Sequence, residues 1–135
     1  MSVLVIDTDV ASAILRGRVP GPLEARLAGQ TLAVTFVTVG ELTKWTLVRS
    51  WGSHRLAVLN HFLTARVGVL PYNAPVARAW GELQARGQIR GRPRPTNDTW
   101  IAACCITSGL PLASLNIKDF IDFAEYDGLQ LLRNT

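Results

Sequence analysis

The sequence predicts an α/β fold organised around a mainly parallel β-sheet. Three observations support this prediction: short apolar runs alternate with segments whose apolar residues repeat at helical spacing, no Asn-Gly or similar hairpin signal separates those runs, and residues 3–6 are apolar without interruption. A strand that is apolar throughout is typical of a parallel sheet covered by helices on both faces. No repeat, linker or low-complexity stretch divides the 135 residues, so we expect one domain over 1–135.

The first half of the chain is expected to contain two strands and three helices. The first strand, 3–6, ends at Asp7, and Asp9 can cap a short helix that stops at Gly17. Pro22 suits the first turn of a second helix. The β-branched and aromatic run 32–37 predicts the second strand, which leads into a helix over about 38–50.

The second half repeats the alternation. Its expected helices are one beginning at Ser53, one from Asn73 to Gly87, and one after Pro95 that ends at Gly109. Its expected strands are 67–70, 112–115 and 129–132. The segment between the last two helices is rich in glycine, proline and arginine and is expected to form a loop.

Composition narrows the classes of protein that need to be considered. Hydrophobic residues make up 48% and charged residues 18%, which excludes a disordered chain. The N-terminal apolar run is too short for a signal peptide or a membrane span, so we expect a cytoplasmic protein with no membrane association. A net charge of +4 gives a mild attraction for polyanions. Cys104 and Cys105 are too few for a metal knuckle and are expected to be buried free thiols.

Acidic residues fall where the parallel strands are expected to end. Asp7 closes the first strand, Glu41 follows the second, and Asp98 opens the helix after the arginine-rich loop; Asn116 and Asp119 follow the fourth strand. Each has a simpler interpretation as a helix-terminal carboxylate, and Thr38 with Glu41 matches a capping box. Several carboxylates at one edge would repel one another unless a cation lay between them, and oxygen ligands favour Mg²⁺ or Mn²⁺.

Four motifs carry a resemblance to a known family. They are Asp7-Thr8-Asp9, the run 38–42 (TVGEL), the run 97–103 (NDTWIAA) and the run 115–120 (LNIKDF). In order and spacing they resemble the PIN-domain toxins of the VapC group, and the likeness covers nearly the whole chain. It implies a three-layer α/β/α sandwich and an Mg²⁺- or Mn²⁺-dependent endoribonuclease, with a cognate antitoxin, an RNA substrate and a homodimer.

Carried over residue by residue, the resemblance implies that Asp7, Glu41 and Asp98 hold the metal. At the fourth position this sequence has the neutral Asn116, with Asp119 able to substitute, so the metal count stays open. The mechanism we expect is attack on the phosphodiester by a metal-activated water, with Asp98 as the acid nearest that water.

Further residues are candidates for RNA contacts. Guanidinium groups beside a metal site suit phosphate binding, although a solvated flexible loop is an equal alternative; the four concerned are Arg86, Arg90, Arg92 and Arg94. Thr8 and Thr96 could offer hydroxyl contacts, but Thr96 could instead cap the helix that carries Asp98. Trp100 is the tryptophan we consider for base stacking, and His54 and His61 suit a surface role.

Two alternatives remain open at this point. Asp7 and Asp9 also fit the opening motif of haloacid-dehalogenase-type phosphohydrolases, in which the first aspartate is the nucleophile, but Lys118 stands alone where those enzymes need a lysine and further acids. The other alternative is a non-catalytic PIN module that binds RNA or protein, its metal site weakened by Asn116.

Overall fold

Five parallel strands form the central sheet of the computed structural model, which describes residues 2–132. They are β1 (Val3–Ile6), β2 (Thr31–Thr35), β3 (Gly68–Leu70), β4 (Leu112–Ala113) and β5 (Leu131–Leu132). Their order across the sheet is β3-β2-β1-β4-β5, and the register places Val5 of β1 beside Ala33 and Leu112. The strand at the middle of the sheet is thus the one that ends at Asp7, as the apolar run 3–6 predicted.

Helices connect the strands. They are α1 (Thr8–Leu15), α2 (Gly21–Leu27), α3 (Phe36–Val48), α4 (Ser53–His61), a π-helical turn η1 (Phe62–Arg66), α5 (Ala74–Ile89), α6 (Thr96–Ser108) and α7 (Ile117–Asp127). Asn73 caps α5 by accepting the Val76 N–H at 2.9 Å, and Gly109 ends α6 at φ 67°, as expected from sequence. Within residues 2–132, none of these helices is long and apolar enough to cross a membrane.

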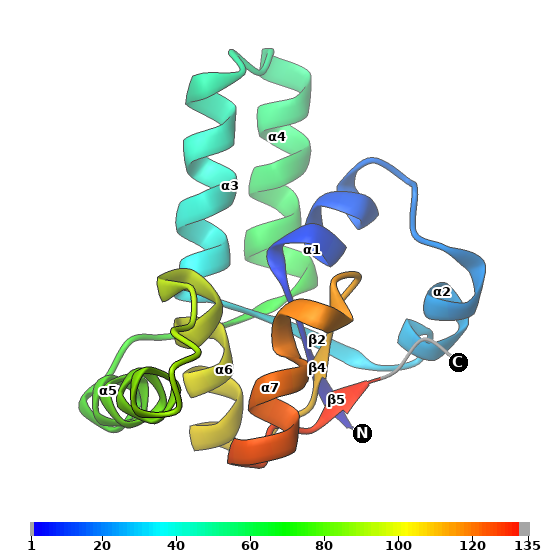
Figure 1. The fold of residues 1–135 in the computed structure, drawn as a ribbon. Helices are drawn as coiled ribbons and strands as arrows, with labels where there is room; N and C mark the ends of the chain where they lie inside the picture. The colour runs from blue at the N-terminus through cyan, green and yellow to red at the C-terminus, as the bar shows by residue number, and fades with distance from the viewer. Residues whose placement is uncertain (1, 133–135) are drawn as a thin grey trace.

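Alternating side chains of the strands build two cores, one on each face of the sheet. Leu4 and Ile6 pack with α1, α2 and α4, whereas Val5 packs with α5, α6 and α7. The result is the predicted three-layer α/β/α sandwich (Figure 1). In the same view α3 and α4 stand side by side and project beyond the other elements as a helical hairpin.

Two helix starts differ from the sequence-based expectation, and both differences bear on the site. Asp7, not Asp9, caps α1 by accepting the Val10 N–H. The second strand stops at Thr35, which caps α3, so this helix begins at Phe36 and not near Thr38. The β-branched run continues across this boundary and therefore hid it.

The helix α5 also continues beyond its expected end at Gly87. Gly87 is buried inside the helix, and a Cβ there would come within 2.9 Å of the Arg92 carbonyl oxygen and 3.0 Å of Arg94 Cδ. This glycine therefore allows the following loop to fold back against α5, and it does not terminate the helix.

Candidate active site

A small pocket of about 80 Å³ lies at the carboxyl edge of the sheet, where β1 and β4 end and α1, α3, α6 and α7 come together. Its polar lining consists of five acids, one amide and one hydroxyl: Asp7, Asp9, Glu41, Asp98, Asp119, Asn116 and Thr8. Trp45, Ile101 and Phe120 complete the wall. All five residues that the sequence suggested for catalysis are brought together here, as expected where parallel strands end.

Asp7 is held at the floor of this pocket. Its side chain is part of a residue only 4% exposed, and its two oxygens accept hydrogen bonds from the Val10 N–H at 2.9 Å and the Ser114 hydroxyl at 2.6 Å. Burial, aided by the negative charges of Asp9 and Asp98, raises the pKa of Asp7 to about 6 against the two hydrogen bonds, which lower it. The fold thus positions a carboxylate that it also makes costly to ionise.

Glu41 is not part of a capping box. Because α3 begins at Phe36, Glu41 lies in its second turn, and its Oε1 accepts the Thr8 hydroxyl at 2.6 Å. The single hydrogen of Thr8 is used there, so the Thr38 hydroxyl donates to Thr8 at 2.9 Å. Asn97 donates to the other carboxylate oxygen at 3.4 Å. The helix-capping alternative for Glu41 is therefore wrong, and Glu41 is oriented toward the pocket by α1 and α6.

Asp98, in the first turn of α6, is the carboxylate with the fewest partners. Within residues 2–132, no donor forms a hydrogen bond with it. Burial raises its pKa to about 6, and the nearby charges of Asp119, Glu41 and Asp9 add to this effect. An unpartnered carboxylate that faces three other acids is the group most in need of a cation or a proton.

The fourth corner of the site contains both candidates. The Asn116 side-chain amide donates to Asp9 Oδ2, and its backbone N–H donates to Ser114 Oγ at 2.9 Å. Asp119 contributes to the raised pKa of Asp98 and so belongs to the same group of charges. Both residues line the pocket.

Three residues of this site were not identified from the sequence. Asp9 was interpreted as a helix cap, although its place two residues after Asp7 on a helix start was a usable signal. Ser114 interrupts an apolar run beside β4, and Asn97 immediately precedes Asp98. Nothing in the local pattern indicated that they would bind the carboxylates of Asp7 and Glu41.

Thr96 does not cap α6. Pro95 occupies the cap position without a side-chain hydrogen bond, and Thr96 is the first residue of the helix. Its carbonyl oxygen accepts the indole N–H of Trp80 at 3.3 Å. The capping interpretation of Thr96 is therefore wrong; a contact of its hydroxyl with RNA stays a prediction.

The arginine-rich segment is neither a flexible loop nor a row of free cations. Arg94 is buried and forms ion pairs with Asp127 at 2.5 Å and Asp122 at 2.8 Å, and its guanidinium also donates to the Leu83 carbonyl. Arg90 pairs with Asp122 at 2.7 Å, and Arg86 with Asp127 at 3.3 Å. These three arginines join α5 and the loop to α7, so we do not carry them forward as RNA ligands. Arg92 is exposed.

Other candidate residues lie away from the acids. Trp100 stacks on Trp80 with ring centroids 5.0 Å apart, and Phe36 and Tyr72 contact it edge-on, so it is part of an aromatic cluster at the base of α6. His54 and His61 are exposed on α4, in agreement with a surface role. The free thiols of Cys104 and Cys105 are buried as predicted, and burial raises the pKa of both, that of Cys104 to about 11.

The donor set of the pocket fits a hard divalent cation. It consists of carboxylate and amide oxygens without histidine or thiolate, and the acids raise one another's pKa values, which an ion between them would reverse. Within residues 2–132, no three acid, histidine or cysteine side chains are already close enough to form a metal cage. Binding would therefore draw the carboxylates inward.

The pH dependence of stability tests the environment of Asp7 directly. In metal-free protein the folded state keeps the Asp7 proton up to a pKa of about 6, whereas the unfolded chain releases it near 3.8. Between these values the folded state binds more protons, so stability falls as the pH rises. We expect unfolding in EDTA to need about 1 to 3 kcal/mol less at pH ~7.5 than at pH ~5.

Asp7→Asn is expected to flatten this dependence and to raise the melting temperature at the higher pH, because the amide keeps a hydrogen bond to Val10 without a buried charge. Thermal unfolding followed by circular dichroism measures both effects. An equal pH slope in the variant and the parent would show that Asp7 is not its source.

Comparison with known proteins is in accord with this geometry. The family model described as PIN domain matches residues 4–127. "Ribonuclease VapC5" of Mycobacterium tuberculosis is 34% identical over 127 residues, which cover 92% of this chain and 87% of the relative. "Ribonuclease VapC1" of Haemophilus influenzae is 25% identical over 121 residues, 87% of this chain and 90% of the relative.

Among solved structures, VapBC-1 from nontypeable Haemophilus influenzae superposes with a TM-score of 0.81 at 25% identity, over 98% of each chain. VapBC-5 from Mycobacterium tuberculosis, described as a member of the VapBC family of toxin-antitoxin systems, gives 0.75 at 26% identity over 98% of this chain and 99% of that one. The chain belongs to the PIN-domain family and, within it, to the VapC group.

Proposed function

We propose that this protein is a divalent-metal-dependent endoribonuclease that acts as the toxin of a toxin–antitoxin pair. The observation that carries the proposal is the convergence of five acids on one pocket at the carboxyl edge of the sheet, in a chain whose relatives are named ribonucleases. Structural neighbours named as toxin–antitoxin complexes support the partner.

The metal, Mg²⁺ or Mn²⁺, would be held by Asp7, Glu41 and Asp98, with Asp119 or Asn116 at the fourth corner. When bound, such an ion acidifies a water and stabilises the charge that develops on the phosphodiester. The second-shell bonds described above keep two of these carboxylates in place: Ser114 fixes Asp7, and Thr8 fixes Glu41.

Asp98 is the residue we assign to the attacking water. Its carboxylate has no hydrogen-bond partner within residues 2–132, and a pKa of about 6 leaves it ionised near neutral pH yet able to accept a proton. Thr8 and Asn97 hold Glu41 on the opposite side. These groups would bind the scissile phosphate and accept the proton of the nucleophile without help from a histidine.

Membership of the PIN-domain family removes the haloacid-dehalogenase alternative. In agreement with this, both oxygens of Asp7 already accept hydrogen bonds, and Lys118 is exposed and does not line the pocket. A non-catalytic module that only binds RNA or protein is the remaining alternative, and the cleavage assay below decides it.

The deciding experiment is cleavage of RNA by the purified chain. We expect total RNA to be cut in Mg²⁺ or Mn²⁺ and to stay intact in EDTA, and sequencing of the new 5′ ends would identify the target. Expression alone should arrest growth, and co-expression of the antitoxin we expect to be encoded beside it should restore growth. RNA that stays intact in all metals would favour the non-catalytic module.

Metal binding can be measured apart from cleavage. Because an ion that binds only the folded state stabilises it, Mn²⁺ at about 100 times its Kd is expected to add roughly 2.7 kcal/mol to the free energy of unfolding. Thermal melting with Mn²⁺, and again after EDTA, measures this gain. An unchanged melting temperature together with RNA cleavage in EDTA would contradict a metal-dependent site.

A further inference from the structure

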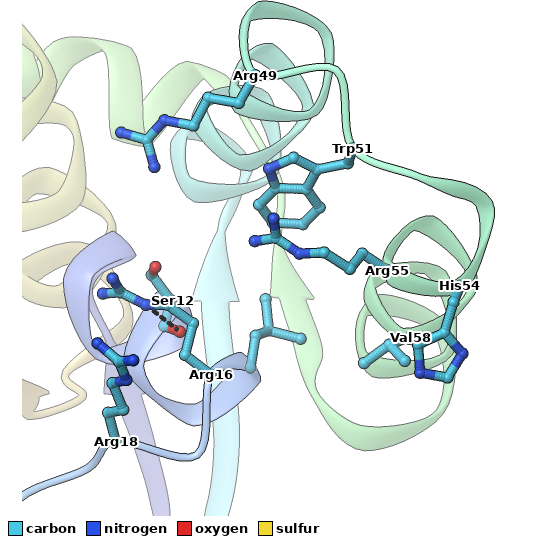
Figure 2. A pocket seen from close by; sticks show the side chains of 9 residues that line it. Ser12, Arg16, Arg18, Arg49, Trp51, His54, Arg55 and Val58 are labelled. Atoms are coloured by element: carbon cyan, nitrogen blue, oxygen red, sulfur yellow. Dashed lines mark hydrogen bonds between the residues drawn. The ribbon is translucent and has the colours of Figure 1, made fainter.

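A second pocket, of about 350 Å³, lies between α1 and the turn that joins α3 to α4. Most of its lining is basic or aromatic: Arg16, Arg18, Arg49, Trp51, His54 and Arg55. Figure 2 shows the guanidinium groups of Arg16, Arg49 and Arg55 extending from three elements toward the same space, with the indole of Trp51 on one wall.

These arginines have no acidic partners. No aspartate or glutamate lines the pocket, and within residues 2–132 none of its four arginines forms an ion pair. Arg86, Arg90 and Arg94, in contrast, are all paired with α7. The concentrated positive charge at this pocket is therefore available to a ligand.

Aromatic contacts order two of the guanidinium groups. Arg55 lies 3.9 Å from the ring centroid of Trp51, and Arg49 lies 5.0 Å from that of Trp45. Stacked guanidinium groups keep their N–H edges free for an oxyanion. In addition, the Trp51 indole N–H is buried without an acceptor, so this wall contains a donor that the protein itself does not satisfy.

The basic pocket adjoins the acidic one. Trp45 of α3 lines the acidic pocket, and Arg49, one helical turn later, stacks on it and lines the basic pocket. On α1 the sequence is the same: Asp9 belongs to the acidic pocket and Ser12 to the basic one. A single extended strand that crosses Trp45 could therefore reach both.

We propose that this pocket, through Arg16, Arg49, Arg55 and Trp51, binds a backbone phosphate of the RNA strand outside the bond that is cleaved. The proposal rests on the proposed ribonuclease function. Guanidinium groups that approach from several directions suit the oxygens of a phosphate. An acidic helical peptide would need a continuous apolar stripe, and the purely aliphatic side chains of the lining are only Leu15 and Val58.

The test is RNA binding by the full chain in EDTA, where the acidic pocket is without metal. The probe is a fluorescein-labelled single-stranded RNA of mixed sequence, and the readout is anisotropy over a series of salt concentrations. Arg49→Gln and Arg55→Gln are each expected to raise Kd about 5- to 10-fold and to lower the salt slope by about 0.7. Arg78→Gln, which removes an exposed charge on α5, is the matched control and should change neither quantity.

The outcomes separate this proposal from the proposed function. If Arg49→Gln and Arg55→Gln bind RNA like the parent while the parent cleaves RNA, the phosphate site is wrong and the ribonuclease stands. If those variants instead lose capture of a co-expressed antitoxin, the pocket is a protein-binding site and the proposal is overturned. If the parent binds the probe through these arginines but cleaves no RNA, the phosphate site stands and the ribonuclease proposal fails.

Discussion

Asp98→Asn is expected to reduce metal-dependent RNA cleavage by about a thousandfold or more. The substitution removes the charge of the carboxylate that has no hydrogen-bond partner within residues 2–132 and that faces three other acids. A catalytic metal contributes several kcal/mol to transition-state stabilisation, and each 1.36 kcal/mol lost is about a tenfold loss of rate. The measurement is the initial rate of RNA cleavage in saturating Mn²⁺.

The same variant is expected to fold normally. Asn has nearly the volume of Asp, and loss of a half-buried charge with a raised pKa removes repulsion in metal-free protein. Glu125→Gln is the matched control, since it removes one acidic charge from the exposed surface of α7. Undiminished Mg²⁺-dependent cleavage by Asp98→Asn, with a normal melting temperature, would show that the acids of this pocket do not form the active site.

The part of this site that sequence could predict is the part fixed by topology. A buried parallel strand that ends in Asp7, with helices after every strand, places later strand ends at the same edge whatever the details of packing. The position of Glu41 was predicted for this reason, although the helix that carries it begins earlier than expected. Over 31–37 the residues suit both strand and helix, so only the Thr35 cap in the structure marks the change.

The interactions that tune the carboxylates could not be predicted. Ser114 lies more than a hundred residues from Asp7, and the two meet because β4 pairs with β1. Asn97 reaches Glu41 across the pocket in the same way. Such hydrogen bonds depend on which strands are neighbours and on side-chain rotamers, and a single sequence encodes neither locally.

The arginine segment shows the converse case, a strong local signal with a different meaning. Four arginines beside Asp98 suggested phosphate binding, but the acids of α7 that pair with three of them lie roughly thirty to forty residues further along the chain. Gly87 is the residue that makes this packing possible, because no side chain there obstructs Arg94. The charges available to RNA are then those of the unpaired pocket between α1 and α4.

Arg94→Met is expected to be the most destabilising of the substitutions considered, at about 3 to 5 kcal/mol. Its guanidinium is 4% exposed and is the partner of the Asp127 side chain, which has no exposed surface at all. Removal of one partner of a buried pair leaves an uncompensated charge, while methionine keeps most of the packing against Phe123. Urea unfolding measures the loss. Arg86→Gln, whose side chain is 53% exposed, should cost only about 0.2 to 1 kcal/mol.

A second substitution distinguishes a structural arginine from an RNA ligand. Asp127→Asn in the Arg94→Met background is expected to restore part of the lost stability, because it removes the stranded charge, whereas Asp127→Asn alone should destabilise. At a temperature where Arg94→Met is still folded, its RNA affinity and salt slope should equal those of the parent. A reduced salt slope without loss of stability would mean that Arg94 contacts phosphate, and that the loop reaches the RNA in a conformation other than the one in which α7 binds it.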